Sequence, residues 1–223
     1  MKILIVNNNL HIRTYPQGLF VRVHSGLKNF FLSIIKSPKD LSEADLSVDR
    51  VILTGSTAYI RQEKDWMIIE RGFIEKWMRK GIPVLGICFG SQLLVRHIFG
   101  EKAITALPFP INGSILVKQE KESLLFKGVP KVFGAIATHY EGINIPTEHI
   151  IASTDVWPQY AFSLPGHVYG IQFHPELCGP IGRFIVFLQR ILYDRHVFQD
   201  FSIKTSARHG SCILKNFIHC TSL

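Results

Sequence analysis

Short apolar runs alternate along this chain with longer stretches of helical periodicity, and this alternation constrains the fold more than any other feature. Buried-strand patterns occur at 2–7, 49–55 and 83–88. The stretch at 64–80 places apolar side chains on one helical stripe and ends before Gly81. Strands that alternate with helices of this length form a mostly parallel sheet with helices on its faces. The sequence therefore predicts an α/β fold with a mostly parallel central sheet flanked by helices.

Further elements follow from the same two periodicities. Residues 25–36 are predicted to form a helix, as are 91–99 and the stretch after Pro180. From about 103 to 172 the chain favours short strands, which predict a small mixed β region. The apolar residues that give 25–36 its helical spacing are Leu27, Phe30, Phe31, Ile34 and Ile35.

The size of the chain bounds its domain content. Its 223 residues, 47% of them hydrophobic, are enough for one substantial globular domain and too few for two large ones. We place that domain at 1–200. The segment at 201–223 mixes Ser, Thr, His, Lys and Cys without a clear period, so we interpret it as a surface appendage or a frayed tail of unknown role.

Charge and hydropathy argue against several classes of protein. Lys and Arg outnumber Asp and Glu by 25 to 17, but no basic block occurs, so the net charge of +8 is interpreted as a solvated surface and not as a nucleic-acid site. No apolar run approaches the roughly 20 residues that span a bilayer. The N-terminus lacks the apolar core and cleavage site of a signal peptide. We therefore expect a cytoplasmic protein that binds neither membrane nor nucleic acid.

The cysteines are scattered without a CxxC pair, at Cys88, Cys178, Cys212 and Cys220. A disulfide framework is not expected without a secretion signal. One alternative is a zinc site in the C-terminal segment, built from His209, Cys212, His219 and Cys220. That spacing matches no closed tetrahedral pattern, so we predict no metal and no cofactor. Cys88 then remains as a candidate nucleophile.

Cys88 lies in the sequence Gly-Ile-Cys-Phe-Gly at 86–90, between a predicted strand and a predicted helix. This is the cysteine form of the nucleophile elbow, in which a sharp strand-to-helix turn projects the nucleophile from the sheet. The glycines leave room for the turn, and the N-terminus of the following helix favours a thiolate. The amide of Phe89 is then placed to hold an oxyanion. A buried core cysteine is the structural alternative.

A second segment, Ile-Gln-Phe-His-Pro-Glu at 171–176, ends another predicted strand. Residues two apart on an extended chain face the same way, so Glu176 can orient the imidazole of His174. His174 would then take the proton of a thiol and return it to a leaving group. By itself, His174 is also compatible with a structural histidine at a strand end.

Together, GICFGSQLL at 86–94 and YGIQFHPEL at 169–177 resemble the two signature blocks of the class I glutamine amidotransferases, in the same chain order of Cys, His and Glu. The likeness covers about 1–195 and is to the GMP-synthase type in particular. It implies a flavodoxin-like fold, with 1–200 as the catalytic domain. It also implies hydrolysis of the glutamine side-chain amide through a thioester on Cys88, with His174 and Glu176 completing the triad.

The resemblance implies roles for other residues as well. Gly55 would donate a second oxyanion amide beside that of Phe89, and Gly90 and Gln92 would line the glutamine pocket. The turn at 54–58 departs from the family pattern, because Thr-Gly-Ser-Thr-Ala has one glycine where many members have two and a proline.

A second departure falls at 138–141, where Thr-His-Tyr-Glu replaces the Ser-His-Gly-Asp of GMP-synthase-type members. Tyr140 stands where the backbone approaches the α-amino acid end of the substrate, which leaves room for a γ-glutamyl compound other than glutamine. His139 is interpreted as either structural or substrate-contacting.

Three functions remain open on the sequence. The first is a glutaminase that passes ammonia to a separate synthase subunit, since the chain has no G-x-x-x-x-G-K-[ST] loop for ATP. The second is a free-standing γ-glutamyl peptidase. The third is a non-catalytic scaffold, which the intact Cys88, His174 and Glu176 argue against. We rank the glutaminase first, with glutamine or another γ-glutamyl compound as substrate.

Overall fold

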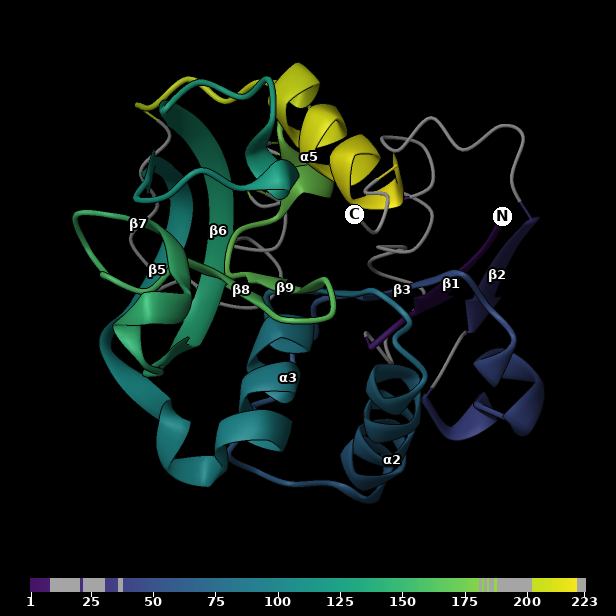
Figure 1. The fold of residues 1–223 in the computed structure, drawn as a ribbon. Helices are drawn as coiled ribbons and strands as arrows, with labels where there is room; N and C mark the ends of the chain where they lie inside the picture. The colour runs from purple at the N-terminus through teal and green to yellow at the C-terminus, as the bar shows by residue number, and fades with distance from the viewer. Residues whose placement is uncertain are drawn as a thin grey trace.

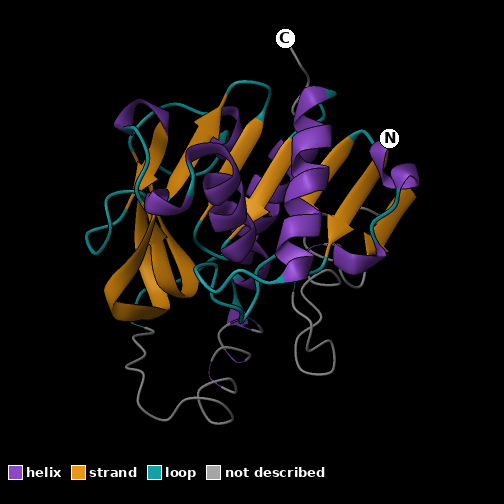
Figure 2. Ribbon diagram, turned by 90° about the horizontal axis from the view of Figure 1, so that it is seen from below, coloured by secondary structure: helices purple, strands orange, loops and turns teal. Residues whose placement is uncertain are grey.

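One sheet runs through the part of the chain that this computed structural model describes, which comprises residues 1–8, 21, 31–35, 38–180, 182, 184, 187 and 202–219 (Figure 1). Within these residues the strands lie side by side in the order β2-β1-β3-β4-β9-β8-β7-β5-β6 (Figure 2). The sheet therefore joins strands that are far apart in the sequence, β4 and β9 above all.

The first half of the sheet is parallel, because each of its strands pairs in parallel with the next. Its strands are β2 (Phe31–Ile35), β1 (Lys2–Val6), β3 (Arg50–Leu53), β4 (Val84–Ile87) and β9 (Val168–Ile171). After the exposed Lys2, strand β1 is a continuous apolar run, as expected for a strand buried on both faces. Ile3 and Ile5 join the core cluster on one face, while Leu4 and Val6 join the cluster on the other.

The second half is antiparallel and continues the same sheet from β9. Its strands are β8 (Ala161–Leu164), β7 (Ile150–Ser153), β5 (Ile104–Gln119) and β6 (Val132–Ile143). The predicted α/β fold with a mostly parallel central sheet is confirmed. The predicted mixed β region is the antiparallel end of that sheet.

Helices cover both faces of the sheet. Helices α2 (Asp65–Arg79) and α3 (Phe89–Phe99) share a core cluster with Leu4 and Val6, whereas α5 (Ala207–His219) shares one with Ile3 and Ile5. Figure 1 shows α5 on the opposite side of the sheet from α2 and α3. The short 3-10 helices are η1 (Pro38–Asp40), η2 (Glu43–Leu46), η3 (Glu101–Ala103), η4 (Leu124–Phe126), η5 (Thr147–His149) and η6 (Pro175–Leu177).

The prediction of a helix at 25–36 is wrong at 31–35. Residues 31–35 form strand β2, which pairs with β1 from Lys2↔Phe31 to Val6↔Ile35. A short apolar run fits either period, and here the run pairs along the edge of β1 as a strand, so the tertiary context selects the extended form. Residues 25–30 lie outside the described residues, as does most of the helix predicted after Pro180.

Part of the segment interpreted as a surface appendage or a frayed tail is a packed helix, because Ala207–His219 forms α5. Residues 201 and 220–223 lie outside the described residues. The buried residues of α5, Gly210, Ile213, Leu214, Phe217 and Ile218, recur at helical spacing and form one apolar stripe. A Cβ at Gly210 would overlap the carbonyl oxygen of Pro175, so α5 packs directly on η6. The division of the chain at residue 200 stays a prediction.

Truncation of Phe217 tests this packing. Its side chain is fully buried and meets the ring of Tyr169 edge-on, with centroids 6.3 Å apart. We expect Phe217→Ala to lower the free energy of unfolding by about 3–5 kcal/mol through lost burial and a cavity. Lys215→Ala, on the exposed face of the same helix, is the matched control. Equal denaturant midpoints for the two variants would contradict the packing of α5 on the core.

Candidate active site

Cys88 lies on a sharp turn at the carboxyl end of β4 and directly precedes α3. Its backbone has φ 52° and ψ −109°, a conformation that costs energy for a residue with a side chain and that recurs at functional sites. The amide of Cys88 donates to the carbonyl of Ile171 on β9 at 2.7 Å. Its own carbonyl accepts from the amides of Ser91 and Gln92, at 3.0 and 3.1 Å. Both ends of the turn are thus held by the backbone.

The two glycines of the elbow allow α3 to lie close against the sheet. A Cβ at Gly86 would lie 2.6 Å from backbone atoms of Gly90 and Ser91. A Cβ at Gly90 would overlap the carbonyl oxygen of Leu53 on β3. Either contact would force backbone to move. Packing therefore explains both glycines, while a role for Gly90 in lining a substrate pocket stays a prediction.

His174 and Glu176 form a buried pair where β9 runs into η6. The Nδ1 of His174 is 2.8 Å from Oε1 of Glu176, and both residues are at most 2% exposed. A carboxylate can only accept, so Nδ1 donates and Glu176 fixes the orientation of the ring. By distance and angle, Nε2 makes no hydrogen bond in the described part of the chain, but the Cys88 side chain is near enough to act on the imidazole. Nε2 is therefore the nitrogen available for proton exchange with Cys88.

The protonation of His174 depends on its charged neighbours. Burial alone lowers the pKa of its imidazole, but the negative charges of Glu176 and of a Cys88 thiolate outweigh burial and raise the pKa to about 10. His174 is therefore an imidazolium at neutral pH when Cys88 is a thiolate. The Sγ of Cys88 also lies 3.6 Å from the carbonyl oxygen of Thr138 on β6.

His139 is enclosed by protein. Its Nδ1 lies 2.9 Å from the carbonyl oxygen of Glu141 and its Nε2 lies 2.7 Å from the hydroxyl of Tyr160. Because the carbonyl can only accept, Nδ1 carries the proton and Nε2 accepts from Tyr160. Burial lowers the pKa of His139 to about 4. The hydrogen bond to the Glu141 carbonyl opposes this shift, and the positive charge of His174 adds to it. These contacts favour the structural interpretation of His139.

Tyr140 and Gln92 differ in exposure. The ring of Tyr140 is 40% exposed and lies against the ring of Tyr59, with centroids 5.6 Å apart. Gln92 is buried, and its Nε2 donates to the carbonyl of Glu141 at 2.7 Å and to Oε1 of Gln172 at 3.2 Å. The amide nitrogen of Gln92 is thus engaged within the protein.

Gly55 and Phe89 follow adjacent strands. Gly55 is buried at the start of the loop at 54–64 that links β3 to α2, and Phe89 begins α3 just beyond β4. The ring of Phe89 packs on Trp66 of α2 with centroids 5.4 Å apart, so its side chain belongs to the core. A shared oxyanion role for the two amides stays a prediction.

Sequence reasoning missed Glu141, Gln172, Tyr160 and Arg96. Each is a buried polar residue whose partners come from distant segments, such as Gln172 with Gln92 and Arg96 with the carbonyl of Ile60. The only local signal was a polar residue within or next to an apolar strand or helix, which does not specify its partner.

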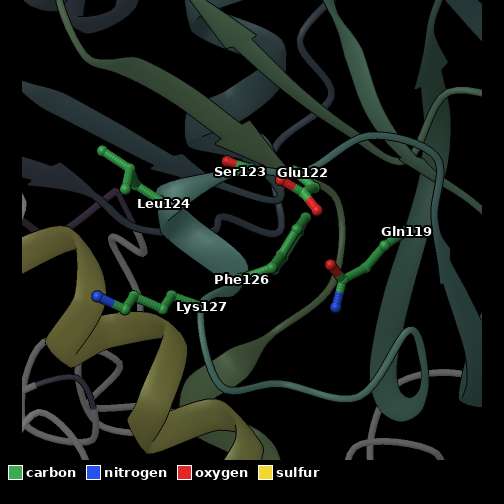
Figure 3. Close-up of a pocket in the computed structure, with 6 residues that line it drawn as sticks. All are labelled: Gln119, Glu122, Ser123, Leu124, Phe126 and Lys127. Carbon is green, nitrogen blue, oxygen red and sulfur yellow. The ribbon is translucent and has the colours of Figure 1, made fainter.

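A surface pocket of about 440 Å³ lies beside η4, apart from the elbow, and Figure 3 shows its lining residues Gln119, Glu122, Ser123, Leu124, Phe126 and Lys127. Among the described residues no group of three or more His, Cys, Asp or Glu is placed to hold a metal. Cys220, from the rejected zinc alternative, lies outside the described residues. The helices described in this structure are all too short or too polar to cross a membrane.

Comparisons with known proteins agree with this arrangement. Residues 23–189 match the family model "Glutamine amidotransferase class-I". The chain is 29% identical over 192 residues to imidazole glycerol phosphate synthase subunit HisH of Methanosarcina barkeri, covering 77% of this chain and 92% of that protein. It is 35% identical over 102 residues to the glutamine-hydrolyzing GMP synthase of Aeropyrum pernix, covering 45% of this chain and 20% of that protein. The chain thus spans about a fifth of that GMP synthase.

A solved structure shows the same fold. The crystal structure of a glutamine amidotransferase from Thermotoga maritima superposes with a TM-score of 0.68 at 19% identity, covering 97% of this chain and 94% of that one. The family model covers most of the chain, including both the elbow at 86–90 and the segment at 171–176. The chain belongs to the class I glutamine amidotransferase family.

Proposed function

We propose that this protein hydrolyses the side-chain amide of glutamine to glutamate and ammonia, with Cys88 as nucleophile, His174 as proton carrier and Glu176 as its orienting partner. The buried His174–Glu176 pair carries the proposal. An imidazole with one nitrogen bound to a carboxylate and the other unpartnered is what a proton carrier for a nearby thiol requires. Membership of the family supports the same chemistry.

The reaction follows from these groups. The thiolate of Cys88 attacks the amide carbon, and the oxygen becomes an oxyanion that the amides of Gly55 and Phe89 would stabilise. The His174 imidazolium gives its Nε2 proton to the leaving nitrogen, ammonia departs, and a γ-glutamyl thioester remains. Neutral His174 then removes a proton from water, whose hydroxide attacks the thioester. Glutamate leaves, and the thiolate–imidazolium pair is restored.

A separate synthase subunit is the proposed user of the ammonia. Relatives named as glutamine-hydrolyzing synthases or as a synthase subunit support this part of the proposal. The proposal also includes a cytoplasmic location for the protein. The alternative of a free-standing γ-glutamyl peptidase is favoured by one observation, the partly exposed Tyr59–Tyr140 pair, which could contact a group beyond the glutamyl moiety.

The first test concerns the nucleophile. We expect Cys88→Ala to lower glutamine hydrolysis at least about a thousandfold while leaving the fold intact, because no other group replaces the thiolate. Labelling by a glutamine-like chloroketone should go to Cys88. Cys178→Ala is the matched control, since burial raises the pKa of the Cys178 thiol to about 12 and keeps it protonated. Labelling of Cys178, together with turnover by Cys88→Ala, would refute the proposal.

A second test separates His174 from Glu176. His174→Ala should lower kcat/KM by a factor that is roughly tenfold or more larger than the factor for Glu176→Ala, because His174 transfers the proton and Glu176 only orients the ring. Glu176→Gln should also move the alkaline limb of the pH profile to lower pH, because the carboxylate charge helps to raise the pKa of His174 to about 10. Equal losses for His174→Ala and Glu176→Ala, with an unmoved alkaline limb, would count against these roles.

The third test addresses the substrate through Tyr140. If the chain is a glutaminase, kcat/KM for glutamine should exceed that for γ-glutamyl dipeptides, and a synthase partner should raise turnover. The peptidase alternative expects the reverse preference, erased by Tyr140→Gly because the ring no longer contacts the larger group. Tyr59→Ala serves as the matched variant on the facing ring. A dipeptide preference that Tyr140→Gly abolishes would replace the glutaminase with the peptidase.

A further inference from the structure

The loop at 54–64, which links β3 to α2 and begins with Thr54 and Gly55, is fixed near its middle by a buried carboxylate from another part of the sheet. Glu141 of β6 is 3% exposed. Its Oε2 accepts from the amide of Ile60 at 2.7 Å, and its Oε1 accepts from Nε of Arg61 at 2.8 Å and from the amide of Arg61 at 3.4 Å. One side chain thus satisfies three donors of the loop.

The charge of Glu141 is balanced within the same contact. The Arg61 guanidinium pairs with the carboxylate while its own side chain is 49% exposed. A buried carboxylate without such partners would be costly and would oppose a negative charge forming nearby. With Arg61 and two backbone amides bound, Glu141 can hold the loop without adding an unbalanced charge beside Cys88.

The backbone of Glu141 connects the loop to the elbow. Its carbonyl accepts from Nε2 of Gln92 at 2.7 Å and from Nδ1 of His139 at 2.9 Å. Gln92 belongs to α3, the helix that Cys88 precedes. Thr138, on the same strand as Glu141, has its carbonyl oxygen 3.6 Å from Sγ of Cys88. Glu141, which belongs to β6, therefore contacts both the loop and helix α3.

From these contacts we infer that Glu141 is a positioning residue for the reaction. Its carboxylate holds the 54–64 loop, and with it the amide of Gly55, at a fixed place relative to Cys88. Oxyanion donors act only when they are held in place before the charge forms, and loops lack the regular backbone hydrogen bonds that would hold them. This inference rests on the proposed function, in which Gly55 stabilises the oxyanion.

Arg96 of α3 holds the same loop through a second set of contacts. It donates through Nη1 to the carbonyl of Ile60, and its Nη2 lies 3.6 Å from Oε1 of Glu63. Glu63 is only partly buried and also pairs with Arg71 at 2.6 Å. Glu43 of η2 pairs with Lys76 at 2.5 Å, outside the loop, so Glu43→Gln is the matched control that removes a paired carboxylate without touching the loop.

The experiment compares Glu141→Gln with Glu43→Gln in the full chain by three measurements. In Glu141→Gln, amide hydrogen exchange at Ile60, at Arg61 or at both should accelerate by about tenfold, because glutamine keeps only one of the two acceptor oxygens and loses the charge. Glutamine hydrolysis should fall roughly tenfold to a hundredfold in kcat, with KM changed less than about threefold. Alkylation of Cys88 by iodoacetamide, which needs no oxyanion donor, should keep its wild-type rate. Glu43→Gln should match wild type in all three measurements.

Three results would overturn the inference. They are unchanged exchange at both Ile60 and Arg61, a loss of alkylation in step with hydrolysis, and a wild-type kcat in Glu141→Gln despite faster exchange. If Glu141→Gln does not fold, Arg61→Met decides, with a severalfold loss of kcat at normal alkylation expected and a wild-type kcat contradicting it. A wild-type protein without amidase activity would instead refute the proposed function, and the exchange data would still decide whether Glu141 holds the loop.

Discussion

The parallel pairing of β4 with β9 is the interaction on which the rest of the site depends. In a parallel pair the carboxyl ends of both strands meet at one edge of the sheet, and loops beyond that edge converge. Here Ile87 pairs with Ile171, and the amide of Cys88 donates to the carbonyl of Ile171. The elbow after β4 and the segment after β9 therefore lie side by side, although many residues separate them in the chain.

The site combines strain and charge that the surrounding core holds in place. The positive φ of Cys88 persists because α3 packs closely on the sheet through Gly86 and Gly90. The buried pair of His174 and Glu176 persists because one partner is a cation when Cys88 is a thiolate. Helix α5 packs beneath the same segment at Pro175. Packing on both faces thus protects an arrangement that would be unfavourable in isolation.

Polar contacts around the elbow extend this organisation to the neighbouring loop. Glu141 joins the 54–64 loop to β6 and α3, and the side-chain nitrogen of Gln92 donates to the carbonyl of Glu141. A place for Gln92 in the substrate pocket stays a prediction. His139 likewise bonds to that carbonyl and to Tyr160. Tyr140 alone among the residues at 138–141 presents a large side chain partly to solvent. His139 and Glu141 thus make their contacts within the protein, and a role for Tyr140 in substrate choice stays a prediction.

The sequence by itself determined the α/β class, the elbow at Cys88 and the spacing of His174 and Glu176, because each depends on residues that are near neighbours in the chain. Only the tertiary structure decided that 31–35 is a strand and that 207–219 is a packed helix. Short apolar runs fit both periods, so the partner that buries them selects the conformation. The contacts of Glu141 and Gln92 were also decided by the tertiary structure. The hydrogen-bond partners of a buried polar side chain come from distant segments, which the local sequence does not specify.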